Sequence, residues 1–142
     1  MLVRLLYASR AAKPQTAKNI AAILAECQKN NPEHGITGVL CYSDDIYLQV
    51  LEGGRDAVCE TFNAIVRDAR HEGVRLLSFE EISERRFSGW SMGQVNIGKI
   101  NSSMLLKYGE KAELNPFNVS GKVSMALLEE LIATASVLGK AV

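Results

Sequence analysis

The sequence has no net charge and no long apolar run, and each absence excludes a class of protein. Sixteen Lys and Arg residues balance sixteen Asp and Glu residues among 142, so the chain lacks the basic surface with which proteins bind nucleic acid or anionic membranes. No apolar stretch approaches the roughly 20 residues that span a bilayer. The N-terminal MLVRLLYAS is too short for a signal peptide. We therefore predict a cytoplasmic protein with neither a membrane nor a direct nucleic-acid partner.

Cysteine and histidine are also scarce. The three cysteines, Cys27, Cys41 and Cys59, are odd in number and lie far apart in apolar surroundings. This pattern favours packing residues in a reducing compartment over disulfides. Neither of the two histidines has a neighbour at metal-ligand spacing. We therefore predict that the protein has no metal site.

What the chain does contain is an alternation of strand and helix patterns. Its length fits a single domain with a sizeable core. Apolar residues at every second position predict strands, and apolar residues at i, i+3, i+4 and i+7 predict helices. The predicted strands are residues 2–8, 35–42, 46–51, 74–82 and 90–97, and the predicted helices are residues 16–29 and 55–70.

The order of these elements indicates the fold class. It is β-α-β-β-α-β with one further strand, the ferredoxin-like α+β arrangement, in which two helices cover one face of a largely antiparallel sheet. We expect the first helix to end at Asn30 and Asn31, because Pro32 cannot continue it. Gly73 is the expected stop of the second helix.

A C-terminal extension, residues 98–142, follows the sheet domain of residues 1–97. A short helix is predicted over 102–108, and Pro116 breaks the chain after it. A longer helix over 122–138 carries an apolar stripe of Leu127, Leu128, Leu131, Ile132, Ala135 and Leu138. The first three strands are apolar on both faces, so the face opposite the two helices needs cover from this extension or from another subunit.

One residue is out of place in the apolar strand IYLQVLEG, residues 46–53. Leaving the amide of Gln49 without hydrogen-bond partners would cost roughly 1–3 kcal/mol. The first and third strands of this fold are adjacent, so Tyr7 and Gln49 meet in the core if both face the helices. Either the phenol and the amide satisfy each other, or they line a polar ligand pocket together with Asn30, Asn31 and the polar end of the second helix.

Five segments, taken together, resemble a known family. LLYAS, NNPEHGITGVLCY, YLQVLEG, IVRDARH and RRFSGWSMG occur in this order and spacing, and they strongly resemble the BLUF family, the sensors of blue light using FAD. The resemblance covers roughly residues 2 to 95. It implies that FAD, with FMN or riboflavin as alternatives, is bound noncovalently between the two helices and the sheet.

The resemblance also assigns roles to individual residues. Tyr7 matches the tyrosine that donates an electron and a proton to the excited flavin, and Gln49 matches the glutamine that bridges this tyrosine and the flavin. An amide suits that role because it has a donor and an acceptor on one rotatable group. Asn31 matches the asparagine that holds the pyrimidine edge of the flavin, and Asn30 lies at a neighbouring polar position.

The end of the second predicted helix carries further matches to flavin contacts: Arg67, Asp68, Arg70 and His71. Basic residues at a helix C-terminus are also favourable without any ligand. Ile23 and Ile65 match apolar residues that flank the flavin ring, and core packing accounts for them equally well.

Trp90 and Met92 match a pair in the last strand of the family, one of which packs beside the glutamine. Because they are two residues apart in a predicted strand, we expect them to share one face. Packing in the core or at a dimer interface is the alternative to a role in signalling.

The resemblance implies a photoreceptor that is not an enzyme. Light would change hydrogen bonds around the flavin and so signal to an effector protein in trans, and we expect a homo-oligomer. Two alternatives belong to other classes. A small hydrolase of the acylphosphatase type needs a phosphate cradle, which is not evident beside Arg10, and a colourless ligand-binding or oligomerisation module needs no flavin.

Overall fold

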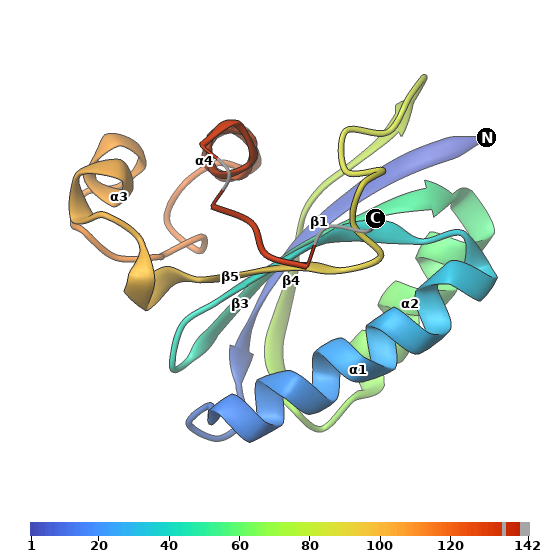
Figure 1. The fold of residues 1–142 in the computed structure, drawn as a ribbon, viewed down its shortest axis with the longest axis horizontal. Helices are drawn as coiled ribbons and strands as arrows, with labels where there is room; N and C mark the ends of the chain where they lie inside the picture. Colours follow the sequence, from blue (N-terminus) through green and yellow to red (C-terminus); the bar gives the residue numbers. More distant parts are fainter. Residues whose placement is uncertain (135, 140–142) are drawn as a thin grey trace.

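A five-stranded sheet lies at the centre of the computed structural model, which describes residues 1–134 and 136–139 (Figure 1). The elements in chain order are β1 (Leu2–Ala11), α1 (Ala17–His34), β2 (Thr37–Tyr42), β3 (Ile46–Gly54), α2 (Arg55–Arg67), β4 (His71–Ile82), β5 (Gly93–Asn96), the 3-10 turn η1 (Ile97–Lys99), α3 (Ser102–Tyr108) and α4 (Gly121–Ala133). The strand order is β4-β1-β3-β2-β5, and only the β2–β5 pair is parallel. This confirms the predicted ferredoxin-like fold with β1 and β3 as neighbours.

Helices cover both faces of the sheet. α1 and α2 lie on one side, and α3 and α4 lie on the other (Figure 1). Buried side chains divide in the same way: Tyr7 packs in a cluster with Ile20 of α1 and Val58 of α2, whereas Leu48 packs in a cluster with Leu128 of α4. The C-terminal extension therefore covers the second face, as the apolar strands require.

The predicted end of α1 is wrong, because the helix continues through Pro32 to His34. Its terminator is Gly35, which has the left-handed φ of 67° that favours glycine. The Gly35 N–H donates to the carbonyl of Pro32 at 3.3 Å and the Ile36 N–H to that of Asn31 at 2.9 Å, the bonding pattern of a Schellman motif. The N–H groups of Gly35 and Ile36 thus satisfy the carbonyls of Pro32 and Asn31 at the end of the helix. The missing N–H of Pro32 is not needed for these bonds.

The predicted end of α2 is also wrong. The helix stops at Arg67, and Asp68 has an extended backbone. Gly73 lies inside β4 at a φ of 57°, near a shift in the pairing between Ala8 and Arg10 of β1. Gly73 therefore supplies the left-handed backbone conformation at an irregular point of the strand and does not end a helix.

α4 is shorter than the predicted helix of residues 122–138. It ends at Ala133, and the Thr134 hydroxyl bonds to the carbonyl of Glu130 at 2.9 Å. Leu138 leaves the helix and forms an isolated antiparallel bridge with Gln94 of β5. Ala135 lies outside the described residues. In the part of the chain that the structure describes, no helix has both the length and the apolarity to cross a membrane.

Gly38 of β2 is required by the close approach of β3. A Cβ at this position would overlap the backbone carbonyl oxygen of Val50. We expect Gly38→Ala to lower the free energy of unfolding by about 2 kcal/mol, because a backbone atom cannot move aside as a flexible side chain can. Gly54→Ala is the matched control, since a Cβ there meets nothing within 4 Å. Urea unfolding curves of the two variants measure the difference, and equal midpoints would contradict this account.

Candidate functional site

Tyr7 and Gln49 form a buried pair at the centre of the sheet. They are directly opposite each other in the β1–β3 register, and 1% of Tyr7 and 4% of Gln49 is exposed. The Tyr7 hydroxyl donates to Gln49 Oε1 at 2.5 Å. Burial raises the pKa of this phenol well above its usual range, so the hydroxyl keeps the proton that makes it a donor.

The other end of the Gln49 amide contacts Met92. Gln49 Nε2 donates to Met92 Sδ at 3.3 Å, a weak bond because thioether sulfur is a poor acceptor. Nε2 carries two hydrogens and Met92 accepts one of them. One amide hydrogen of Gln49 therefore has no acceptor among the residues that the structure describes.

The pair lies at the wall of a cavity of about 350 Å³ between α1, α2 and the sheet. This volume lies within the range of small-molecule sites in proteins. The lining includes most of the residues that the sequence singled out: Tyr7, Ile23, Asn30, Asn31, Gln49, Ile65, Asp68, Arg70 and His71. The structure therefore brings these nine residues together around one space.

Charged and polar groups gather at one end of this cavity. Arg70 bonds Asp68 through Nε at 3.0 Å and reaches Glu26 of α1 at 3.0 Å. The bond from Arg70 holds the pKa of the Asp68 carboxyl below its usual value. His71 is held nearby, with Nδ1 at 2.7 Å from the buried Ser9 hydroxyl. Burial lowers the pKa of His71, which favours its neutral form.

Asn31 links the cavity to the segment before β5. Its side chain is buried, and Nδ2 donates to the carbonyl of Ser91 at 2.7 Å. Its Oδ1 has no hydrogen-bond partner among the described residues. The neighbouring Asn30 lines the cavity from a more exposed position.

Three candidate residues, Arg67, Trp90 and Met92, do not line the cavity. Arg67 is exposed at the last position of α2 and does not line the cavity. Trp90 packs in the cluster of the C-terminal helices, whereas Met92 packs in the cluster of α1 and α2. The expectation that they share a face is therefore wrong, because regular β5 begins only at Gly93 and the strand alternation does not extend to these residues.

The structure adds residues to the cavity that we did not single out. Tyr47 is 3% exposed, and its ring centroid lies 4.4 Å from that of His71. The period of two that selects Gln49 also selects Tyr47, so the sequence contained this signal. Cys27 also lines the cavity, and burial raises the pKa of its thiol to about 11. Such a thiol stays protonated and is a poor nucleophile at neutral pH.

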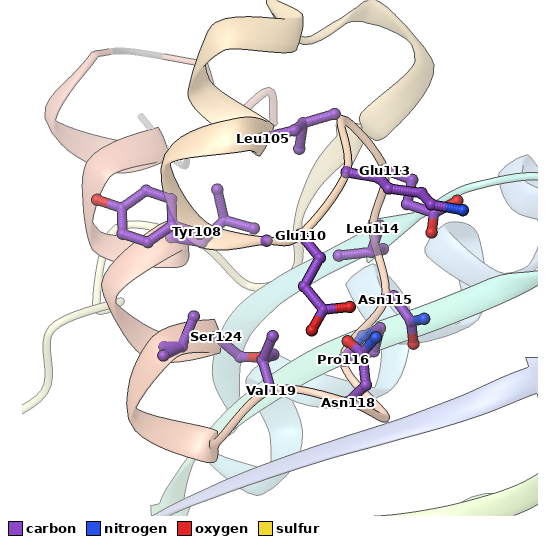
Figure 2. A pocket seen from close by; sticks show the side chains of 14 residues that line it. Leu105, Tyr108, Glu110, Glu113, Leu114, Asn115, Pro116, Asn118, Val119 and Ser124 are labelled. Atoms are coloured by element: carbon purple, nitrogen blue, oxygen red, sulfur yellow. The ribbon is translucent and has the colours of Figure 1, made fainter.

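A second cavity, of about 210 Å³, lies within the C-terminal extension. Leu105 of α3, Ser124 of α4 and residues 109–119 between these helices line it (Figure 2). None of the candidate residues borders it. The cavity beside Gln49 is the candidate functional site because nine of the candidate residues line it.

The fold and this site together define a ferredoxin-like domain with a ligand cavity between its helices and its sheet. The profile of the BLUF family, sensors of blue-light using FAD, matches residues 2–93. The chain therefore belongs to the BLUF family, the flavin-using sensors of blue light.

Solved structures of this family resemble the chain closely. The protein described as "BlsA photo-activated state" superposes with a TM-score of 0.79 and 33% identity, over 93% of this chain and 95% of that one. The protein described as "BlrB - a BLUF protein, dark state structure" gives a TM-score of 0.77 and 32% identity, over 94% of this chain and 96% of that one. In both cases the similarity includes the C-terminal extension.

Larger proteins contain a similar domain. Photoactivated adenylate cyclase subunit beta of Euglena gracilis is 32% identical over 64% of this chain and 11% of its own length. Blue light- and temperature-regulated antirepressor BluF of Escherichia coli (strain K12) is 29% identical over 61% of this chain and 22% of its own length. The chain thus spans about a tenth of the cyclase subunit that it matches.

Proposed function

We propose that this chain is a blue-light photoreceptor that binds one FAD noncovalently in the cavity beside Gln49. The observation that carries the proposal is the buried bond between Tyr7 and Gln49 at the wall of that cavity. The flavin supplies the absorption of blue light and accepts an electron in the excited state. The chain supplies the hydrogen bonds that respond to it, and it carries out no turnover of a substrate.

The cavity walls are chemically suited to a flat ring with one polar edge. Ile23 of α1 and Ile65 of α2 offer apolar contacts to the faces of the ring. Asn31 Oδ1 can accept a hydrogen bond from a donor of the polar edge, and the second hydrogen of Gln49 Nε2 can be donated to an acceptor of that edge. Arg70 and His71 border the same cavity and supply further donors.

Tyr7 and Gln49 carry the response to light in this proposal. With a flavin bound as the electron acceptor, Tyr7 would supply an electron and its phenolic proton, the proton would pass through Gln49, and both would return. The Gln49 amide ends rotated or as its tautomer. In the rotated amide, Oε1 replaces Nε2 beside Met92 Sδ, and two acceptors cannot form a hydrogen bond. The contact between Gln49 and Met92 is therefore specific to one orientation of the amide.

We propose that flavin binding and signal output lie in different parts of the chain. Residues 1–97 form the flavin-binding domain, and residues 98–142 form the extension through which an effector protein in trans, or another subunit, receives the signal. The alternative functions, a small hydrolase or a colourless module, have no specific observation in their favour. Membership of the family of flavin-using sensors favours the photoreceptor.

The test is the absorption spectrum of the purified protein before and after blue light. We expect a yellow protein with one flavin per chain and a small, reversible red shift on illumination. Release of the flavin by denaturation and its chromatography distinguish FAD from FMN and riboflavin. A folded protein that stays colourless after reconstitution with FAD would overturn the proposal.

A further inference from the structure

The last described residues form a strap along the outer edge of β5. We use this name for residues 136–139. Leu138 and Gln94 exchange two backbone hydrogen bonds, each of 3.0 Å. Val137 is buried in the cluster of the C-terminal helices, and a Cβ at Gly93 would lie 2.6 Å from both Val137 and Trp90. The chain descends from α4 to reach this position beside β5 (Figure 1).

The three residues before β5 connect the strap to the cavity. The carbonyl of Ser91 accepts from Asn31 at 2.7 Å, and Met92 Sδ accepts from Gln49 at 3.3 Å. A Cβ at Gly139 would lie 3.6 Å from the carbonyl oxygen of Met92, so the strap also approaches the residue that contacts Gln49. Met92 therefore has the Gln49 amide on its side chain and the strap at its backbone.

The strap is attached in a way that permits release. Ser136, at the start of the strap, donates its N–H to the carbonyl of Leu131 in α4 at 2.8 Å. Against β5 itself, two backbone hydrogen bonds and the buried Val137 side chain hold the strap, and the Leu138 side chain is 63% exposed. Few contacts of this kind give a low free energy of local opening. A switch needs an element of this kind, because the change of one weak hydrogen bond at Gln49 can shift only an equilibrium that is close to balance.

We infer that docking of the strap on β5 positions Met92 beside Gln49, and that rotation of the Gln49 amide weakens this docking. The inference rests on the proposed function, and it names the strap as the first element outside the cavity to respond to light. Because coupling between two sites is reciprocal, a variant that loosens the strap must also change the equilibrium of the amide. Leu138, Val137 and Gly139 are positioning residues in this scheme.

Two substitutions of Leu138 separate the backbone of the strap from its side chain. Leu138→Pro removes the N–H that donates to the carbonyl of Gln94. Leu138→Ala keeps both backbone bonds and shortens a side chain that is mostly exposed. We expect Leu138→Pro to change the rate of return to the dark spectrum by about fivefold, the effect of losing one hydrogen bond. Leu138→Ala should leave this rate within about twofold of the unaltered chain.

Hydrogen exchange gives a readout that does not depend on the flavin spectrum. In the unaltered chain the amides of Gln94 and Leu138 should lose protection in the light, and in Leu138→Pro the Gln94 amide should be weakly protected already in the dark. Val137→Ala, which removes the apolar anchor, should behave like Leu138→Pro and gives a second variant if the proline prevents folding. Equal recovery rates in Leu138→Pro and Leu138→Ala, or unchanged protection of the Gln94 amide in the light, would overturn the inference. If the red shift is normal in such an experiment, the proposed photoreceptor function still stands. Absence of any red shift in the unaltered chain would overturn both.

Discussion

Gln49→Leu is expected to abolish the red shift while the protein stays yellow. Leucine has a similar volume to glutamine but no hydrogen-bonding group. In this variant no amide connects the Tyr7 hydroxyl to the flavin. Most of the cavity wall is unchanged. We expect flavin affinity to fall by no more than about tenfold, because one hydrogen bond contributes on the order of 1 kcal/mol. Difference spectra in the dark and the light, with a flavin titration, measure the two effects separately.

Tyr47 supplies the control for the partner of Gln49. Tyr7→Phe removes the hydroxyl that donates to Gln49, and we expect it also to abolish the red shift. Tyr47→Phe removes a phenol from the same cavity wall, yet no bond joins that phenol to Gln49. It should keep a red shift of normal size. A normal photocycle in Gln49→Leu, or the loss of the photocycle in Tyr47→Phe with a normal one in Tyr7→Phe, would contradict the assigned pair.

The central part of this site could be predicted because it depends on regular strands. Successive side chains of a strand point to opposite faces of the sheet, and this determines which residues of β1 and β3 face α1 and α2. The fold class makes these two strands neighbours. These two facts place Tyr7 and Gln49 on the same face of neighbouring strands, and the observed register brings them directly opposite each other. The convergence of Asn31 and Asp68 on the same cavity follows from the ends of the two helices.

The parts that could not be predicted lie where the backbone is irregular. Trp90 and Met92 precede β5 rather than lying in it, so alternation assigns them to one face when they lie on two. The apolar stripe of the C-terminal extension predicts a helix that continues to Leu138, but Leu138 instead forms backbone hydrogen bonds with Gln94. A bridge between two distant backbone segments leaves no periodic pattern in the side chains, since it uses only backbone groups.

A buried ion pair was missed for a related reason. Arg4 lies near the start of β1 and is 5% exposed, and its partner Glu52 is fully buried near the end of β3. A buried arginine needs a partner, but the residues that pair are 48 positions apart. Their opposition in the β1–β3 register identifies the pair, and that register is known only from the structure.

Glu52 carries the largest stability effect that we expect in the chain. Its carboxylate accepts from Arg4 at 2.8 Å, and it also accepts the backbone N–H of Phe87 at 2.7 Å and that of Arg86 at 3.0 Å. Glu52→Gln leaves the Arg4 charge buried without its main partner. We expect the free energy of unfolding to fall by about 3–5 kcal/mol, as urea unfolding at pH 7 would measure.

Glu80 is the matched control, because it is the second carboxylate on Arg4. Arg4 contacts Glu80 at 2.8 Å, but the Glu80 side chain is 56% exposed. Glu80→Gln should therefore cost less than about 1 kcal/mol. Combining Arg4→Met with Glu52→Gln should restore part of the stability lost in Glu52→Gln alone, because the double variant buries no unpaired charge. If Glu52→Gln and Glu80→Gln cost the same, the buried carboxylate does not anchor this end of β3, and the segment from Arg86 to Met92 is held by its other contacts.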